Sequence, residues 1–325
     1  MKLGIKLWQF CLAAALIAAG PVHAQTAWPS KPLRIIVPFT AGGSTDTVAR
    51  ILADKLSPRL GQPVVVENRA GAGGTLGTAL AAKSDADGYT MVIATSSTMG
   101  VAPNIYKSLQ YDPVRDFQPV TLLGTATILL ALHPSVPANS VTELIALAKQ
   151  EPGKLTFASG GNGSISHLVG EYFKLMAGVD MVHVPYRGDT EMLTDLVGGR
   201  VSLAFGTAVA YLPYTEKGAL KALAVTNPQR SPIVPKLPTV DESGLKGFDA
   251  IQYFGLLLPA GVPQAVVNRL HKESVEILKL PDVRERLQGL GFDIVGNTPA
   301  EFAAFLKADR DKWGKIVKDA GVTVQ

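Results

Sequence analysis

The chain has 325 residues, a formal net charge of +4 at pH 7 and hydrophobic side chains at 47% of its positions. A chain of this length can form one large or two medium-sized domains around a conventional hydrophobic core. Its 31 Lys and Arg residues are interspersed with 27 Asp and Glu residues and form no basic run, so we expect no nucleic-acid partner.

Residues 1–24 have the pattern of a secretory signal peptide. Lys2 and Lys6 give the segment a positive start, and an uncharged apolar stretch follows them. That stretch is too short to span a bilayer, which takes about 20 apolar residues. Val22-His23-Ala24 resembles a cleavage site, and cleavage there predicts an exported, periplasmic protein that begins at Gln25.

Cysteine chemistry is excluded from the mature protein. The single cysteine, Cys11, lies within the signal peptide, which leaves no thiol for disulfides, metal binding or nucleophilic catalysis. No two histidines have the spacing of a zinc site. We therefore expect neither a metal nor another cofactor.

Apolar runs that fit short strands alternate with helix-like patterns along the mature chain. The first strand, residues 33–37, is followed by apolar residues at helical spacing from Val48 to Leu60, and Gly61 ends that helix. Uninterrupted apolar strands between helices predict an α/β fold with parallel sheets covered on both faces. Further strands are expected at residues 64–66, 89–94, 128–133, 155–158, 181–184, 201–205 and 220–225.

Two capping boxes and a return connection organise the rest of the chain. Ser140-x-x-Glu143 opens one helix, and Thr298-x-x-Glu301 opens the last one. Residues 227–261 are rich in Pro and Gly, which predicts a connection that returns from one half of the chain to the other.

Two glycine-rich junctions follow predicted strands, one in each half of the chain. The first is Pro38-Phe39-Thr40-Ala41-Gly42-Gly43-Ser44-Thr45-Asp46, and the second is Ser159-Gly160-Gly161-Asn162-Gly163-Ser164. Each places bare backbone and small hydroxyls at the start of a helix, where free N–H groups and the helix dipole attract an anion. Two such junctions in separate halves predict a carboxylate held between two lobes.

The spacing Ser164-x-x-His167 admits two interpretations. A catalytic hydroxyl–imidazole pair would make the protein a secreted hydrolase, whereas a capping serine with a first-turn histidine marks only a helix start, and we favour the second. The chain has no Gly-x-Ser-x-Gly elbow, and Gly71-x-Gly73-Gly74-x-x-Gly77 fits a tight turn better than a nucleotide loop. We therefore expect a binding protein and not an enzyme.

A series of motifs runs from Trp28 almost to the C-terminus. They are Trp28-Pro29-Ser30-Lys31-Pro32-Leu33-Arg34-Ile35-Ile36-Val37-Pro38-Phe39, Ala41-Gly42-Gly43 with Asp46, Val66-Glu67-Asn68-Arg69, Asp87-Gly88-Tyr89-Thr90, Tyr111-Asp112-Pro113, His183-Val184-Pro185-Tyr186-Arg187-Gly188, Leu223-Ala224-Val225-Thr226 and Pro259-Ala260-Gly261. In the same order, these motifs resemble those of the Bug receptors, the extracytoplasmic solute-binding proteins of tripartite tricarboxylate transporters.

The resemblance implies a two-lobed periplasmic-binding-protein clamshell, type II-like, in which each lobe is a mostly parallel sheet flanked by helices. The first lobe is expected to comprise residues 25–124 and 249–325, and the second residues 125–248. The implied protein is a monomer that captures a small carboxylate, such as an amino acid or a di-, tri- or aromatic carboxylate, for membrane transporter subunits. An exported protein that presents the carboxylate to a membrane sensor kinase stays open as an alternative.

The resemblance also implies a site in which both glycine loops grip one carboxylate of the ligand, partly through bridging waters. The expected ligand-binding residues are Phe39, Thr40, Ala41, Gly42, Gly43, Ser44, Asp46, Ser96, Ser97, Ser159, Gly160, Gly161, Asn162, Gly163, Ser164, His167, Asp189, Thr190, Phe205, Gly206 and Thr207.

Two places depart from the family pattern. Thr40 stands where many relatives have Pro, and Asp189-Thr190-Glu191 stands where small residues are usual. Asp189 fits a pocket acid that contacts a ligand ammonium or hydroxyl or excludes a bulky dianion, and it also fits an N-cap for the helix expected at residues 190–197. We favour the N-cap.

Overall fold

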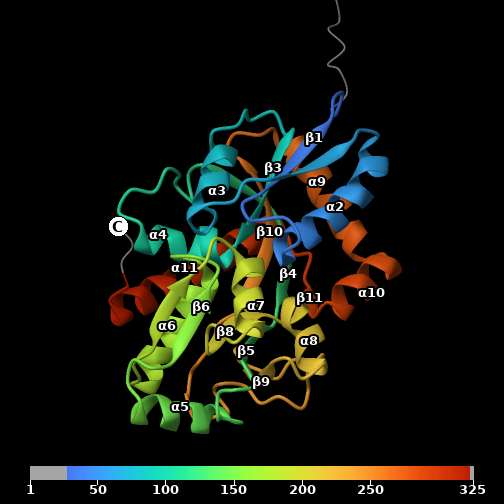
Figure 1. Ribbon diagram of the computed structural model, residues 1–325. Coiled ribbons are helices and arrows are strands. Elements are labelled where there is room, and N and C mark those ends of the chain that lie inside the picture. Colours follow the sequence, from blue (N-terminus) through green and yellow to red (C-terminus); the bar gives the residue numbers. More distant parts are fainter. Residues whose placement is uncertain (1–27, 323–325) are drawn as a thin grey trace, which may run out of the picture. The chain divides into compact units, whose positions relative to one another are not determined.

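The computed structural model describes residues 28–322, so the predicted signal peptide at residues 1–24 lies outside the described residues. The chain divides after Ser30 into two units. All the described helices and strands belong to the second unit, Lys31–Gln325, where two sheets carry helices on their faces (Figure 1). The expected two-lobed α/β fold is confirmed.

The first sheet has its strands in the order β11-β4-β10-β3-β1-β2. β1 pairs in parallel with β2 and β3. β10 pairs antiparallel with both β3 and β4, and β11 adds antiparallel to β4. These strands are β1 (Leu33–Val37), β2 (Val64–Asn68), β3 (Thr90–Thr95), β4 (Phe117–Ala126), β10 (Gln252–Pro259) and β11 (Phe292–Ile294).

The second sheet has the order β7-β6-β8-β5-β9. β6 pairs in parallel with β7 and β8, and β5 pairs antiparallel with β8 and β9. These strands are β5 (Ile128–Leu132), β6 (Thr156–Ser159), β7 (Val182–Pro185), β8 (Leu203–Thr207) and β9 (Lys221–Val225).

Both sheets are mixed, which corrects the expectation of mostly parallel sheets. Strands joined through a helix, such as β1 and β2 or β6 and β7, pair in parallel because a helical crossover returns the chain to the same end of the sheet. The antiparallel pairs involve the strands where the chain passes between sheets. Only Thr127 separates β4 from β5, and after β9 the chain returns to the first sheet as β10, which runs against β4.

Helices cover both sheets, and the alternation of side chains along the strands shows how. On β5, Leu130 and Leu132 pack with α5 and α6, whereas Leu129 and Ala131 pack with α7 and α8 on the opposite face. The helices are α2 (Ser44–Leu60), α3 (Thr75–Ala82), α4 (Ala102–Ile105), α5 (Val141–Gln150), α6 (Ile165–Ala177), α7 (Asp189–Val197), α8 (Ala208–Glu216), α9 (Gln264–Leu278), α10 (Pro281–Gly289) and α11 (Pro299–Ala320), with short turns η1 (Ala72–Gly74) and η2 (Ser96–Val101).

The last helix, α11, contributes side chains to the cores of both lobes. Phe302 and Leu306 near its start belong to the core cluster of the first sheet. Trp313 and Ile316, further along, belong to the cluster that includes the helices of the second sheet. The capping box predicted for its start is confirmed, since Thr298 accepts a hydrogen bond from Glu301 N and its own N–H donates to the Glu301 carboxylate.

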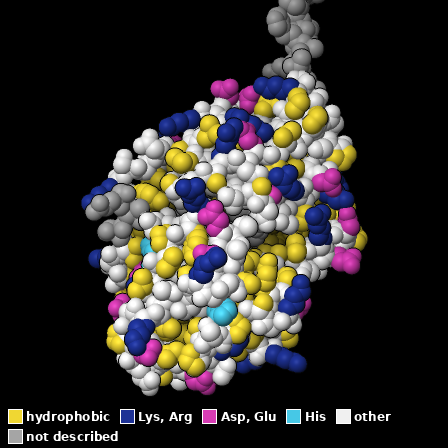
Figure 2. All heavy atoms as spheres, in the orientation of Figure 1, with side chains coloured by type: hydrophobic (Ala, Val, Ile, Leu, Met, Phe, Trp, Pro, Cys, Tyr) yellow, Lys and Arg dark blue, Asp and Glu magenta, His cyan; other side chains and the backbone are white. Residues whose placement is uncertain are grey.

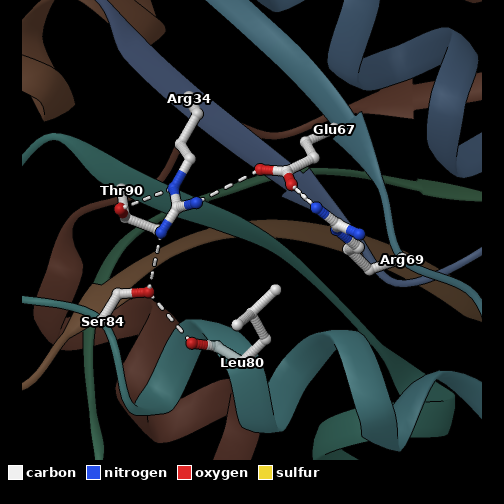
Figure 3. Close-up of polar contacts among 6 residues, drawn as sticks. All are labelled: Arg34, Glu67, Arg69, Leu80, Ser84 and Thr90. Carbon is white, nitrogen blue, oxygen red and sulfur yellow. Dashed lines mark hydrogen bonds and ion pairs between the residues drawn. The ribbon is translucent and has the colours of Figure 1, made fainter.

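Arg34 ties three strands of the first sheet together (Figure 3). Its Nε donates to Thr90 Oγ1 on β3 at 3.0 Å, and its guanidinium also contacts Glu67 on β2 and Ser84 after α3, both at 3.3 Å. Glu67 in turn accepts from Arg69 Nε at 2.8 Å. This network links β1 to its two neighbours in the sheet, β2 and β3.

The surface agrees with the charge pattern of the sequence. Figure 2 shows basic and acidic side chains scattered over the visible face, with no field of one sign. None of the helices within residues 28–322 is both long and apolar enough to cross a membrane.

Candidate functional site

A cavity lies where the two glycine junctions meet. Its empty space is about 630 Å³, a figure that includes space open to solvent. The N-termini of α2 and α6 and the ends of β1 and β8 reach it. Its lining residues are Phe39, Thr40, Gly43, Ser44, Thr45, Ser97, Ile128, Gly160, Ser164, Ile165, Ser166, Gly188, Asp189, Phe205, Gly206, Thr207 and Gln252.

The first junction presents an uncapped helix start to this cavity. α2 begins at Ser44, and its N-cap, Gly43, supplies no side chain to bond the N–H groups of the first turn. Gly43 has an ordinary extended conformation, with φ −79°, and the left-handed turn falls on Gly42, with φ +84°. The backbone thus requires glycine at position 42, whereas at position 43 glycine leaves the helix start accessible.

Asp46 holds this junction from behind and does not line the cavity. Its buried carboxylate accepts hydrogen bonds from Gly42 N, Arg50 Nε and Asn68 Nδ2, each at 2.9 Å. Burial alone would raise its pKa, but the bonds from Arg50, Gly42 and Asn68 prevail and lower it. Asn68 also donates to Phe39 O, so these polar residues fix the shape of the loop.

The second junction ends in a serine-capped helix. Ser164 is the N-cap of α6, and its Oγ accepts from His167 N at 3.3 Å and lies 3.0 Å from Ser166 Oγ. Ser166 Oγ also accepts from Gly160 N at 3.0 Å. Ser97, which follows β3 of the first sheet, accepts from Ile165 N at 2.9 Å. The capping interpretation of Ser164 is confirmed.

A stacked histidine pair supports the second junction. The rings of His167 and His183 lie 4.0 Å apart at an interplanar angle of 16°. His167 Nδ1 accepts from Gly163 N, and His183 Nε2 is 2.6 Å from Ser159 Oγ. Burial lowers the pKa of His167 to about 3 and that of His183 to about 4, so both rings are neutral near pH 7. His167 and Ser159 therefore hold the loop and do not line the cavity.

Asp189 lies in the cavity lining and does not cap its helix. α7 begins at Asp189 itself, its N-cap is Gly188, and no side chain bonds the helix start. The favoured N-cap interpretation is therefore wrong, because the helix starts one residue earlier than expected and turns the carboxylate toward Gly160. A Cβ built on Gly160 would lie 2.5 Å from Asp189 Oδ1, so any larger residue there would require this side chain to move.

The remaining walls are apolar or carry hydroxyls. Phe205 on β8 is fully buried, and Ile128 lines the cavity at the start of β5. Thr207 ends β8, and Gln252 begins β10. Among the described residues, no group of three side chains suited to binding a metal is present.

The structure brings only part of the expected set to the cavity. Expected residues that line it are Phe39, Thr40, Gly43, Ser44, Ser97, Gly160, Ser164, Asp189, Phe205, Gly206 and Thr207. Expected residues that lie behind or beside the lining are Ala41, Gly42, Asp46, Ser96, Ser159, Gly161, Asn162, Gly163, His167 and Thr190.

Some residues line the cavity although their sequence context gives little indication that they belong to a binding site. Thr45 and Gly188 adjoin expected residues, and Ser166 is the second hydroxyl of the α6 start. Gln252 is a polar residue at the start of the apolar strand β10. Its position indicates a site residue only when the strand is known to reach the cavity. Ile128 and Ile165 are apolar residues with no distinguishing signal.

Known proteins resemble this chain in both sequence and fold. The family model described as tripartite tricarboxylate transporter family receptor matches residues 48–322. Protein BugT of Bordetella pertussis is 37% identical over 315 residues, which cover 97% of this chain and 96% of BugT. The structure of R. palustris Rpa4515 with adipate has a TM-score of 0.88 and 36% identity, over 91% of this chain and 99% of that one. MatC (Rpa3494) from Rhodopseudomonas palustris with bound malate has a TM-score of 0.85 and 32% identity, over 89% and 100%.

Proposed function

The chain belongs to the tripartite tricarboxylate transporter receptor family, the Bug receptors, and on that premise we propose that it is a periplasmic protein that captures a small organic acid between its lobes and delivers it to the membrane subunits of a transporter. The family is one of solute-binding receptors, and we propose a binding role without catalysis for this chain. Relatives have been solved with adipate and with malate, both carboxylates.

One observation carries the proposal: two helix starts converge on a cavity that has no Lys, Arg or His in its lining. The first-turn N–H groups of α2 have no side-chain cap and are preorganised donors for an anion. Hydroxyls of Ser97, Ser164 and Ser166 stand beside them. Such donors bind a carboxylate by charge-assisted hydrogen bonds without a cationic side chain.

We assign the two sets of expected site residues different roles. One carboxylate of the ligand contacts the backbone at Gly43 and Ser44 together with Ser164, and the carbon skeleton extends along Phe205. Residues behind the lining, such as Asp46 and His167, shape the loops and make no contact with the ligand.

We also propose that the lobes divide as the sequence suggested, with residues 25–124 and 249–325 in the first and 125–248 in the second. The strands of the first sheet fall within the first set except for the last two residues of β4, and those of the second sheet fall within the second. α11 packs into both cores and so connects the two lobes.

A thermal-shift screen of carboxylates tests the proposal. A ligand that binds only the folded protein stabilises it by mass action, by about 2.7 kcal/mol at 100 times its Kd. We expect at least one small carboxylate to raise the Tm, and calorimetry to confirm one site. The proposal would be overturned if no carboxylate raised the Tm at millimolar concentration while a neutral sugar or a polyamine did.

Two further measurements test export and delivery. Mass spectrometry of the protein from a periplasmic extract should give a chain that begins at Gln25. Uptake of the labelled ligand by cells that contain the membrane subunits should require this protein. Ligand-dependent kinase activity without uptake would favour the sensory role instead.

A further inference from the structure

Asp189 is the one charged side chain among the residues that line the cavity. The residue is exposed to solvent, and its carboxylate lies against Gly160 of the second junction. Within residues 28–322, no Lys or Arg belongs to the cavity lining. An acid is thus built into a cavity whose other polar groups suit an anion.

The carboxylate of Asp189 has no hydrogen-bond or ion-pair partner among the described residues. Burial raises its pKa, with no donor to oppose the effect. Tyr211, whose own pKa is raised by burial and then by the charge of Asp189, has a buried hydroxyl that makes no hydrogen bond to it. The acid therefore lines the cavity without a partner from the described part of the chain, and a cationic group on a ligand would supply one.

A second acceptor in the same cavity is also unpartnered. The side chain of Gln252, 4% exposed, donates through Nε2 to Tyr253 O at 3.3 Å. Its Oε1 is buried and accepts no hydrogen bond from any described residue. Gln252 begins β10 of the first sheet, and Asp189 begins α7, which packs on the second sheet, so acceptors from both lobes line the cavity without a donor among these residues.

We propose that the ligand is a zwitterion, a carboxylate that also carries an ammonium group, and that Asp189 selects it by pairing with that ammonium. This inference rests on the proposed function, because the glycine junctions hold the carboxylate end. An ammonium offers three donors and a positive charge, which satisfy both the acid and a neutral acceptor such as Gln252 Oε1.

The same acid disfavours a dicarboxylate of equal length. Its second carboxylate would face the Asp189 carboxylate in a space without a cationic side chain, and like charges at close range repel strongly when water is excluded. Asp189 thus provides both the attractive and the repulsive part of specificity.

Calorimetry with matched ligands tests this assignment. The panel consists of ω-amino acids of two to six carbons, each with the alkyl acid, the hydroxy acid and the dicarboxylate of the same length. We expect the ω-amino acid of one length to bind at least about tenfold more tightly than its three matched acids. Asp189→Asn should reduce that preference by about tenfold or more and improve binding of the dicarboxylate.

Glu191→Gln is the matched control, because Glu191 is exposed in the same helix turn and does not line the cavity. It should retain the wild-type preference, and thermal melts should show that both variants fold. Tightest binding of the hydroxy acid, the alkyl acid or the dicarboxylate, or an unchanged preference in Asp189→Asn, would overturn the inference while leaving the carboxylate-binding function intact. If no member of the panel or any other carboxylate binds, the proposed function itself fails.

Discussion

Thr40 of the first glycine junction lies directly against Gly188 at the start of α7. A Cβ built on Gly188 would be 2.9 Å from Thr40 Oγ1, closer than ordinary side-chain contacts allow. The first residue follows a strand of the first sheet, and the second precedes a helix of the second lobe. The two lobes therefore approach so closely beside the cavity that a methyl group on Gly188 would require the Thr40 side chain to move.

Gly188→Ala should weaken ligand binding by hindering closure of the lobes. The φ of Gly188 is 175°, an extended conformation that alanine adopts without strain, so the effect is steric and costs about 1–3 kcal/mol. Calorimetry should show the loss, and small-angle scattering should show less compaction with ligand. Thr40→Ala in the same chain should restore binding, because only the Thr40 Cβ, at 3.8 Å, would remain in contact. Equal binding by wild type and Gly188→Ala would show that the ligand does not require this approach.

Gly43→Val should abolish binding of every carboxylate while the protein stays folded. The φ of Gly43 is −79°, and a Cβ there would meet only Thr40 O at 3.7 Å, so valine adds no backbone strain. It would cover the open start of α2, and losing two charge-assisted hydrogen bonds lowers affinity by about 100-fold or more. Gly289→Val, at a position with open space, is the control for calorimetry and thermal melts. Normal affinity in folded Gly43→Val would remove the first junction from the site.

The glycine junctions were predictable because their signals are local. An apolar strand, glycines and a helical pattern occur in sequence, and both junctions reach the same cavity. Two features were not predictable in the same way. The antiparallel pairing of β10 depends on contacts with strands far away in sequence, which periodicity does not encode. Whether Asp189 caps α7 or lines the cavity depends on a shift of the helix start by one residue. Sequence patterns do not locate helix ends that accurately.

The histidine pair should make the folded protein sensitive to acid. The pKa values of His167 and His183 are lowered to about 3 and about 4, whereas an unfolded histidine titrates near 6.5. As the pH falls below 6.5, the unfolded state binds protons that the folded state does not, so the free energy of unfolding decreases until the folded pKa values are reached. NMR titration should show both rings unprotonated at pH 5. Titration of either ring near pH 6.5 would contradict the buried, neutral pair.

Asp309 on α11 should have the opposite effect on stability. Its side chain is buried, Oδ1 accepts from Trp313 Nε1 at 3.1 Å, and Oδ2 has no partner among the described residues. Burial raises its pKa to about 7, so between about pH 4 and pH 7 the folded state retains a proton that the unfolded state has released. Stability from this group is complete below pH 4 and decreases as the pH rises, by up to about 1.4 kcal/mol per unit.

Asp309→Asn isolates this effect from that of the histidines, because the amide can still accept from Trp313 but does not ionise. The free energy of unfolding of both proteins should be measured in urea from pH 4 to pH 8. As the pH rises, the variant should become more stable relative to the wild type, and this relative gain should level off above about pH 7. Asp311→Asn, which alters an exposed acid paired with Lys307 on the same helix, should lack this trend between pH 5 and pH 8, because the pKa of Asp311 is lowered by its hydrogen bond from Lys307. A constant difference between Asp309→Asn and the wild type across the range would mean that Asp309 is ionised in the folded protein and that the buried carboxylate has a partner.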